Sequence, residues 1–333
     1  MPLGIDYKVI AIDPTGKYKF DLSKLVTALT WGDDETEMAA KAQITIANIR
    51  YKGKYLASYL QLMTRIYIYT KSGSKYYERF RGIVWEIEND DDTEKTHTVL
   101  AYDRMIYLMK THDNAFFPKG KTCEYIIKKI CSKWGIKVKY SWYAHKCGKK
   151  KYNDQTVADI FTSLMDGAKR GTGHGYVFRM DKGILKVMKK GQNKKIPILK
   201  YKQNMTKSTR KKSLDDICTK VAIVGSEKKS GAVPVLATVK KNNKKYGTIQ
   251  QFVEKEEGST LAKAKKEARH ILHDQGKPTE EIEVVCKDVP WIRKGDTVYA
   301  HSANLKNYYY CTAVEHNGID GTMTINLEVR KGA

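Results

Sequence analysis

The two ends of the chain share one order of predicted strands, and this internal repeat constrains the fold more than any other feature. A segment over 66–70 matches one over 298–302 at an offset of 232, and at the same offset a tyrosine pair at 76–77 falls on a second pair at 308–309. Alternating and β-branched or aromatic residues in these segments are typical of strands. We therefore predict that the two ends fold as similar β domains.

The repeat continues past the tyrosine pairs with small changes of offset. Val84 falls on Val314 after a deletion of two residues, and Arg104 falls on Arg330 at an offset of 226. Between them lies a polar hairpin, which in the first copy is the acidic loop 89–94. The alternative interpretation is that any two β-hairpins align as well as these do.

The middle of the chain has a different periodicity. Apolar residues recur at helical spacing over 124–134 and 157–168, and strand-like segments follow at 138–142, 176–180 and 184–188. Both ends instead hold short strands separated by clusters of turn residues, as in small sandwiches and barrels. These patterns predict an α+β, mainly β, fold with two small β-barrel or sandwich domains and an inserted α+β module.

The same patterns predict three domains. The first β domain covers 1–104, the inserted module covers 105–204, and the second β domain covers 205–333. The last domain contains one helix over 259–275, with Ser259 expected as its N-cap.

The positive charge is concentrated in the middle of the chain. The formal net charge is +24, and residues 105–215 alone hold 27 Lys and Arg against 7 Asp and Glu. Within 182–212 there are 12 basic residues and no acidic one. From this segment we predict seven tentative partner-binding residues: Lys189, Lys190, Lys194, Lys195, Arg210, Lys211 and Lys212.

Three interpretations of this basic segment stay open. It is a solvated lysine face, a surface for an acidic protein, or a nonspecific and salt-sensitive site for DNA or an anionic envelope. Aromatic residues between Trp134 and Tyr143 alternate with Lys137 and Lys139, as in a platform for stacking bases, although they equally suit the core of the module.

The sequence offers little support for an enzyme, and we predict none. The glycine-rich segment 171–175 follows a helix and precedes a strand, the reverse of a phosphate-binding loop. The carboxylate pairs at 33–34 and 215–216 are interpreted as caps and loops. His270 and His273 have a metal-like spacing but lack further ligands. We therefore predict no catalytic residue, metal, cofactor or small-molecule substrate.

The chain also lacks signals for a membrane or an oxidising compartment. No run approaches the roughly 18 apolar residues of a membrane span, and the acid at Asp6 is unlike a signal peptide. The six cysteines are scattered without a C-x-x-C pair, which indicates free thiols.

Four segments resemble a known family. They are Phe80-Arg81-Gly82-Ile83-Val84, Ser213-Leu214-Asp215-Asp216-Ile217-Cys218-Thr219-Lys220-Val221, the helix over 260–275, and Lys294-Gly295-Asp296-Thr297-Val298. Together with the order of the parts, they resemble the XkdQ-type tail proteins of PBSX-like prophages and, more broadly, the baseplate hub proteins of contractile phage tails and R-type bacteriocins.

The resemblance implies a fold, an assembly and partners. The two β domains would be tube-type barrels, and a homotrimer would place six of them in a pseudo-six-fold ring between a tail tube and a spike. The partners would be the tube protein, the spike protein and other baseplate proteins, in a particle assembled in the bacterial cytoplasm. In such a ring we expect segment 182–212 to face outward or toward an acidic neighbour.

Two other functions are weaker alternatives. The second interpretation is a basic nucleic-acid-binding protein, and the third is a tail-associated cell-wall hydrolase.

Overall fold

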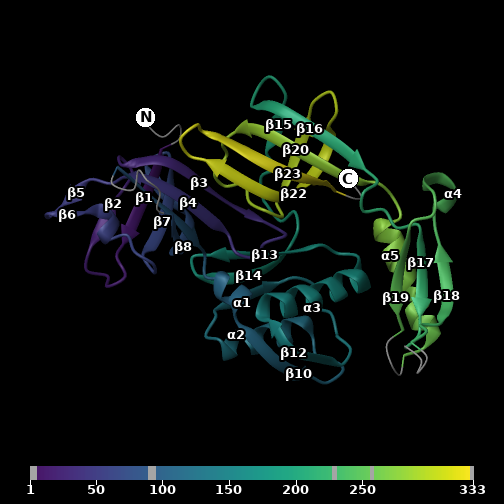
Figure 1. The fold of residues 1–333 in the computed structure, drawn as a ribbon. Helices are drawn as coiled ribbons and strands as arrows, with labels where there is room; N and C mark the ends of the chain where they lie inside the picture. The colour runs from purple at the N-terminus through teal and green to yellow at the C-terminus, as the bar shows by residue number, and fades with distance from the viewer. Residues whose placement is uncertain (1–5, 89–94, 227–230, 256–258, 331–333) are drawn as a thin grey trace. The chain divides into compact units, whose positions relative to one another are not determined.

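The computed structural model describes residues 6–88, 95–226, 231–255 and 259–330, so the predicted acidic loop 89–94 lies outside the described residues. The chain divides into two compact units (Figure 1). The larger unit comprises Met1–Ser208 and Glu283–Ala333, and the smaller unit is Thr209–Ile282. The expected domain 205–333 is thus divided, because its centre forms a unit of its own.

The first β region lies in the larger unit and is antiparallel. Its strands are β1 (Tyr7–Ile12), β2 (Lys19–Asp21), β3 (Val26–Asp34), β4 (Lys41–Ala47), β7 (Arg65–Ser72), β8 (Lys75–Glu88) and β9 (Thr96–Tyr102). They are ordered β3-β4-β9-β8-β7-β1-β2. In β4, Ala42, Ile44 and Ile46 are buried while the residues between them are not, so the strand presents one apolar face to the core. A small hairpin, β5 (Arg50–Tyr51) and β6 (Lys54–Tyr55), and the 3-10 turn η1 (Leu56–Ser58) lie between β4 and β7.

The second β region repeats this order. Its strands are β15 (Ile198–Lys200), β16 (Met205–Ser213), β20 (Thr279–Lys287), β21 (Thr297–His301), β22 (Lys306–Asn317) and β23 (Thr322–Val329). They are ordered β16-β20-β23-β22-β21-β15, which matches β3-β4-β9-β8-β7-β1 position by position. One difference is that β15 pairs with β21 in parallel, whereas β1 and β7 are antiparallel.

The two β regions share one sheet. Strand β22 pairs with β3 in antiparallel register, from Ala313 opposite Asp34 to Asn317 opposite Thr30 (Figure 1). The approach is close at Gly32, where a Cβ atom would lie 2.0 Å from the carbonyl oxygen of Val314. The predicted mainly β, α+β class is confirmed, but the described strands form one continuous sheet of 13 strands and no closed barrel is assigned among them.

Strand pairing supports the repeat but corrects its alignment. Val298 pairs with Tyr309, whereas its counterpart Ile66 pairs with Gly82, so β8 matches β22 at an offset of 227. The two tyrosine pairs are therefore not equivalent, and the predicted match of Val84 with Val314 is wrong. The hairpin between β7 and β8 is shorter than the one between β21 and β22, which shifts the sequence along the second strand.

The corrected alignment places the same irregularities in both copies. A β-bulge falls between Val84 and Glu86 in β8, and at an offset of 227 another falls between Cys311 and Ala313 in β22. Bulges are specific features of a strand pair, so a shared position is strong evidence of a repeat.

The turn before the second strand of each copy is also shared. Val84 exchanges backbone hydrogen bonds with Met63 and Thr64, and Cys311 exchanges them with Gly295 and Asp296. Met63 and Gly295, 232 residues apart, both have a left-handed backbone, with φ of 70° and 80°. Glycine adopts this conformation without steric cost, whereas Met63 is a rare non-glycine example.

The inserted module lies between β9 and β15. Its elements are α1 (Ile106–Lys110), β10 (His112–Phe117), α2 (Cys123–Lys133), β11 (Val138–Ser141), β12 (Lys150–Thr156), α3 (Val157–Thr172), β13 (Tyr176–Asp181) and β14 (Ile184–Lys189). Both predicted helices are confirmed. The Thr122 side chain caps α2, and the Thr156 side chain caps α3 by accepting a hydrogen bond from the Asp159 backbone. The two helices pack their apolar stripes into one core with the sheet β11-β14-β13.

The smaller unit is a three-stranded sheet with one helix. Its elements are β17 (Lys220–Val224), β18 (Val235–Lys240), α4 (Asn243–Tyr246), β19 (Gln250–Glu254) and α5 (Leu261–Gln275). Ala264, Ala268 and Leu272 of α5 pack against Val221 and Ile223 of β17. The N-cap of α5 is Thr260, which accepts from the Lys263 backbone, and not Ser259 as predicted.

Candidate functional site

Lys190, one of the predicted partner-binding residues, is part of the interior of the fold. Its side chain is only 7% exposed, and its Nζ lies 2.8 Å from Glu35 and 2.9 Å from Glu328. Burial lowers the pKa of Lys190, but the two carboxylates outweigh it and raise that pKa; burial also raises the pKa of Glu35. Since Lys190 joins the inserted module to both β regions, we remove it from the candidate partner surface.

The neighbouring lysines differ from Lys190. Lys189 Nζ lies 3.7 Å from the centre of the Tyr143 ring, which also stacks on His174 at 4.0 Å. Lys194 and Lys195 follow β14 and are exposed. Lys194 and Lys195 are therefore the members of this group with ammonium groups open to an acidic partner.

The aromatic residues of the module do not form one exposed platform. Trp142 is buried, and its Nε1 donates to the Gly175 carbonyl at 3.0 Å. Trp134 is exposed at the end of α2, where its Nε1 donates to Asp113 at 3.0 Å. With Tyr143 already contacted by Lys189, this arrangement favours a structural role over base stacking.

Arg210, Lys211 and Lys212 lie together at the end of β16, in the smaller unit. They form cross-strand ion pairs with Glu280 and Glu281 of β20, at 2.7 Å for Arg210, 3.5 Å for Lys211 and 3.7 Å for Lys212. Such exposed pairs contribute little to stability, about 0–1 kcal/mol each. The seven predicted residues therefore divide between the two units.

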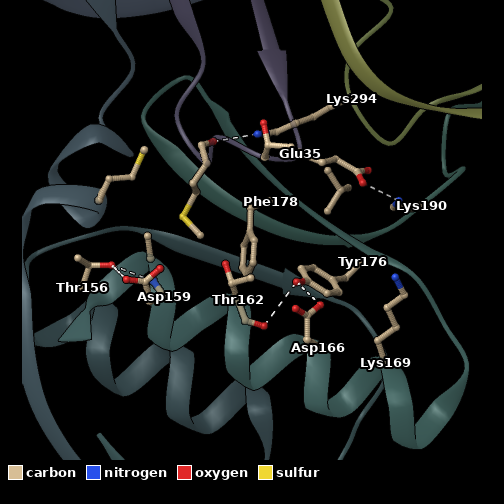
Figure 2. A pocket seen from close by; sticks show the side chains of 15 residues that line it. Glu35, Thr156, Asp159, Thr162, Asp166, Lys169, Tyr176, Phe178, Lys190 and Lys294 are labelled. Atoms are coloured by element: carbon tan, nitrogen blue, oxygen red, sulfur yellow. Dashed lines mark hydrogen bonds and ion pairs between the residues drawn. The ribbon is translucent and has the colours of Figure 1, made fainter. Parts of the chain in front are cut away.

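A cavity of about 450 Å³ lies between α3, β13 and the turn after β3 (Figure 2). Most of its polar groups already bond to one another: the Tyr176 hydroxyl donates to Asp166 at 2.8 Å, and the Thr156 hydroxyl donates to Asp159 at 2.6 Å. Burial, and then Asp166, raises the pKa of Tyr176. These contacts hold β13 and the start of α3 in place and provide no nucleophile with an adjacent base.

The other chemical candidates have structural positions as well. In the glycine-rich segment, Gly173 ends α3 with a φ of 76°, as a left-handed C-cap. The described residues contain no group of three or more His, Cys, Asp or Glu side chains placed to hold a metal, and His273 instead contacts Asp274. Within the described ranges, no helix is long and apolar enough to cross a membrane.

The junction of the two β regions contains a buried ion pair that the sequence did not reveal. Asp33 was interpreted as a loop residue, but it lies in β3 with its side chain fully buried. Arg293 Nε donates to Asp33 Oδ2 at 2.5 Å, and the Lys294 backbone N–H donates to Oδ1 at 2.8 Å. Although burial opposes it, the positive charge of Arg293 and Lys294 lowers the pKa of Asp33.

The Lys294 side chain completes this junction. Its Nζ donates to three backbone carbonyls in the turn after β3, those of Asp34, Glu37 and Met38, at 2.7, 3.0 and 2.9 Å. Burial lowers the pKa of Lys294. Three short-range acceptors fully satisfy an ammonium group, so this lysine fixes the turn against the second β region.

The inserted module is joined to the same place. Arg179 of β13 donates to Asp296 Oδ1 and to the Lys294 carbonyl, both at 2.6 Å. Lys294-Gly295-Asp296, which the sequence analysis singled out only as a turn, is thus where three parts of the larger unit meet.

A second buried network crosses the same sheet. His316 Nδ1 lies 2.6 Å from Asp288, and the Tyr7 hydroxyl donates to the other carboxylate oxygen at 2.5 Å. The Trp31 ring stacks on His316 at 4.0 Å and its Nε1 lies 3.1 Å from the Tyr7 oxygen. Buried and mutually satisfied polar groups of this kind specify one arrangement of the parts they connect.

The fold is that of phage tail proteins. The 43 kDa tail protein of prophage MuSo2 from Shewanella oneidensis matches with a TM-score of 0.69 and 14% identity over 97% of this chain and 98% of that chain. A tail protein from Neisseria meningitidis MC58 matches with a TM-score of 0.68 and 14% identity over 98% and 97%. The E. coli c3393 protein, a type VI secretion component described as similar to T4 tail proteins gp27 and gp5, matches with a TM-score of 0.52 and 11% identity over 92% and 74%.

Sequence comparison gives the family. A family model described as YQBQ-like matches residues 29–330, and the chain therefore belongs to the YQBQ-like family. A search of the curated proteins finds no match to this chain.

Proposed function

We propose that this chain is a structural hub of a baseplate or tail, without enzymatic activity, and that three copies form a pseudo-six-fold ring. The ring would join a tail tube to a spike in a contractile phage tail or a tail-like bacteriocin. The observation that carries the proposal is the repeated β region, in which strand order, bulge and left-handed turn recur within one chain.

Symmetry explains why such a repeat is useful. A six-fold tube end and a three-fold spike cannot match subunit by subunit, but three chains with two equivalent β regions present six. A ring closes only if each contact repeats with nearly the same rotation, so the two regions need similar edges. Matching strand order from β3 to β7 and from β16 to β21 supplies such edges.

Rigid coupling of the two regions is the second requirement. The Asp33–Arg293 pair and the Lys294 contacts connect them without an intervening flexible hinge. A hub with this junction transmits a displacement of the tube to the spike as one body.

We propose the tube protein, the spike protein and other baseplate proteins as partners, in a particle assembled in the bacterial cytoplasm. Lys194 and Lys195 are exposed cations suited to an acidic protein neighbour. Arg210, Lys211 and Lys212 are assigned a different partner below.

Mass photometry of the full chain, alone and with the tube and spike proteins, tests the proposal. We expect trimers, and a ternary complex when both partners are present. A chain that stays monomeric with both partners and binds duplex DNA tightly at physiological salt would instead support the nucleic-acid interpretation.

A further inference from the structure

The contact between β3 and β22 inside one chain has an open counterpart. Strand β22 pairs with β21 over its first half and with β3 over 313–317. Its counterpart β8 pairs with β7 over its first half, up to Ile83 opposite Arg65. Beyond that point no described strand pairs with the same edge of β8, where Glu86, Ile87 and Glu88 lie. At the offset of 227, these three residues match Ala313, Val314 and Glu315.

The other side of the contact has an open counterpart as well. Strand β16 occupies the position of β3, and one of its edges is unpaired because β16 ends the sheet. A repeated hydrogen bond aligns them: the Ala47 N–H donates to the Leu25 carbonyl, and the Lys287 N–H donates to the Asn204 carbonyl, both at 2.8 Å. The resulting offset of 179 places 30–34 on 209–213.

A second repeated bond supports this alignment. The Asn48 N–H donates to the Lys95 carbonyl at 2.8 Å, and the Asp288 N–H donates to the Gly321 carbonyl at 2.9 Å. Both differ by the offsets already given by the flanking strands, 240 for β4 and β20 and 226 for β9 and β23.

The two open edges are complementary in charge. Segment 209–213 carries Arg210, Lys211 and Lys212, whereas the free end of β8 carries exposed Glu86 and Glu88. Opposite charges facing each other across an antiparallel strand pair are stabilising, and like charges are destabilising.

Apolar side chains flank both edges. Leu62 and Met63 are 53% and 50% exposed, although their counterparts Lys294 and Gly295 are buried in the junction against the turn after β3. Leu214, which follows β16 and matches Glu35 of that turn, is 45% exposed. Leucine and methionine thus lie open where the chain's own junction is closed.

We propose that β16 over 209–213 pairs antiparallel with Glu86–Glu88 of β8 in a second copy of the chain, with Leu214 packed beside Leu62 and Met63. The contact between subunits then repeats the β3–β22 contact within each subunit. The two surfaces differ, so the contact is head-to-tail, and three such contacts close the ring on which the proposed function rests. Pairing also covers two strand edges that would otherwise promote aggregation.

Disulfide trapping tests this contact. Glu88 matches Glu315, which faces Gly32, and Gly32 matches Lys211. Residues directly opposite in an antiparallel pair lie within the range that a disulfide spans. Chains carrying only Glu88→Cys are mixed with chains carrying only Lys211→Cys and oxidised mildly; the six native cysteines are buried.

We expect a covalent dimer from the mixture and a closed covalent trimer from the double variant. The matched control pairs Glu88→Cys with Lys244→Cys, an exposed lysine of the same unit outside β16, and gives no specific product. A mixture that yields no more dimer than this control overturns the contact.

A charge exchange gives an independent readout. Lys211→Glu with Lys212→Glu should lower the fraction of trimer at least tenfold at low salt, and adding Glu86→Lys with Glu88→Lys should restore it. Loss without restoration, in chains whose folding is intact by circular dichroism, contradicts the pairing. Wild-type trimers that fail to crosslink overturn the contact but leave the hub proposal standing, whereas a wild-type monomer under every condition, with the tube and spike proteins present, overturns both.

Discussion

Replacing Arg293 with methionine should destabilise the larger unit strongly, because it leaves the carboxylate of Asp33 buried without its main counter-charge. Asp33 has no exposed side-chain surface, and Arg293 is 17% exposed. Removing one member of a buried pair costs about 3–5 kcal/mol, and the remaining Lys294 N–H bond at 2.8 Å places this case near the lower value, about 3 kcal/mol. Urea unfolding followed by tryptophan fluorescence measures the loss, since Trp31 is buried at the same junction.

The pH dependence gives this prediction a second readout. In the wild type the folded pKa of Asp33 is lowered, so its stabilising contribution is present above the unfolded pKa near 4 and is lost as pH falls through the folded value. Without Arg293, burial dominates and raises that pKa, so the deficit of Arg293→Met should be largest at pH 7 and shrink toward pH 4. A deficit below about 1 kcal/mol, as for an exposed pair, or one that does not change with pH, would refute the reasoning.

Three further predictions concern other parts of the chain. Replacing Lys194 and Lys195 with Gln should change stability by less than about 0.5 kcal/mol but weaken recruitment of an acidic baseplate partner in a salt-dependent way, as measured by pull-down over a salt series. Thr260→Ala should cost the smaller unit about 1 kcal/mol in thermal or urea unfolding, whereas the matched Ser259→Ala change should cost less than half of that. Burial raises the pKa of Asp103 to about 6, so its contribution to stability is greatest below pH 4 and is lost as pH rises through 6; Asp103→Asn should flatten the stability profile between these values, and an unchanged profile would contradict the assignment.

The sequence predicts the local elements well where one periodicity dominates. The helices over 124–134 and 157–168 were recognisable because their apolar residues recur at helical spacing and both are capped by threonine. The mainly β class was recognisable for the same reason, from alternation in short segments.

The alignment of the repeat could not be read from side chains alone. The tyrosine pairs match in sequence, but strand register depends on the length of the preceding turn, which differs between the β7–β8 and β21–β22 hairpins. The signal that was available is Arg104 with Arg330 at an offset of 226, close to the offset of 227 that pairing gives for β8 and β22.

The buried charges were invisible for a different reason. Asp33 and Lys294 are residue types that normally lie in solvent, and only their long-range partners make burial possible. Those partners lie about 260 positions away in the sequence, so no local pattern indicates them. The division of 205–333 was missed likewise, because β16 and β20 each begin in one unit and end in the other.

Cryo-electron microscopy of the assembled full-length chain tests the central claim most directly. The account predicts a three-fold particle of three times the 38.1 kDa chain mass, in which six similar β regions alternate around the axis, the first and second region of each chain side by side. A monomer, a two-fold dimer, or a three-fold particle whose second β regions lie outside the ring would contradict it.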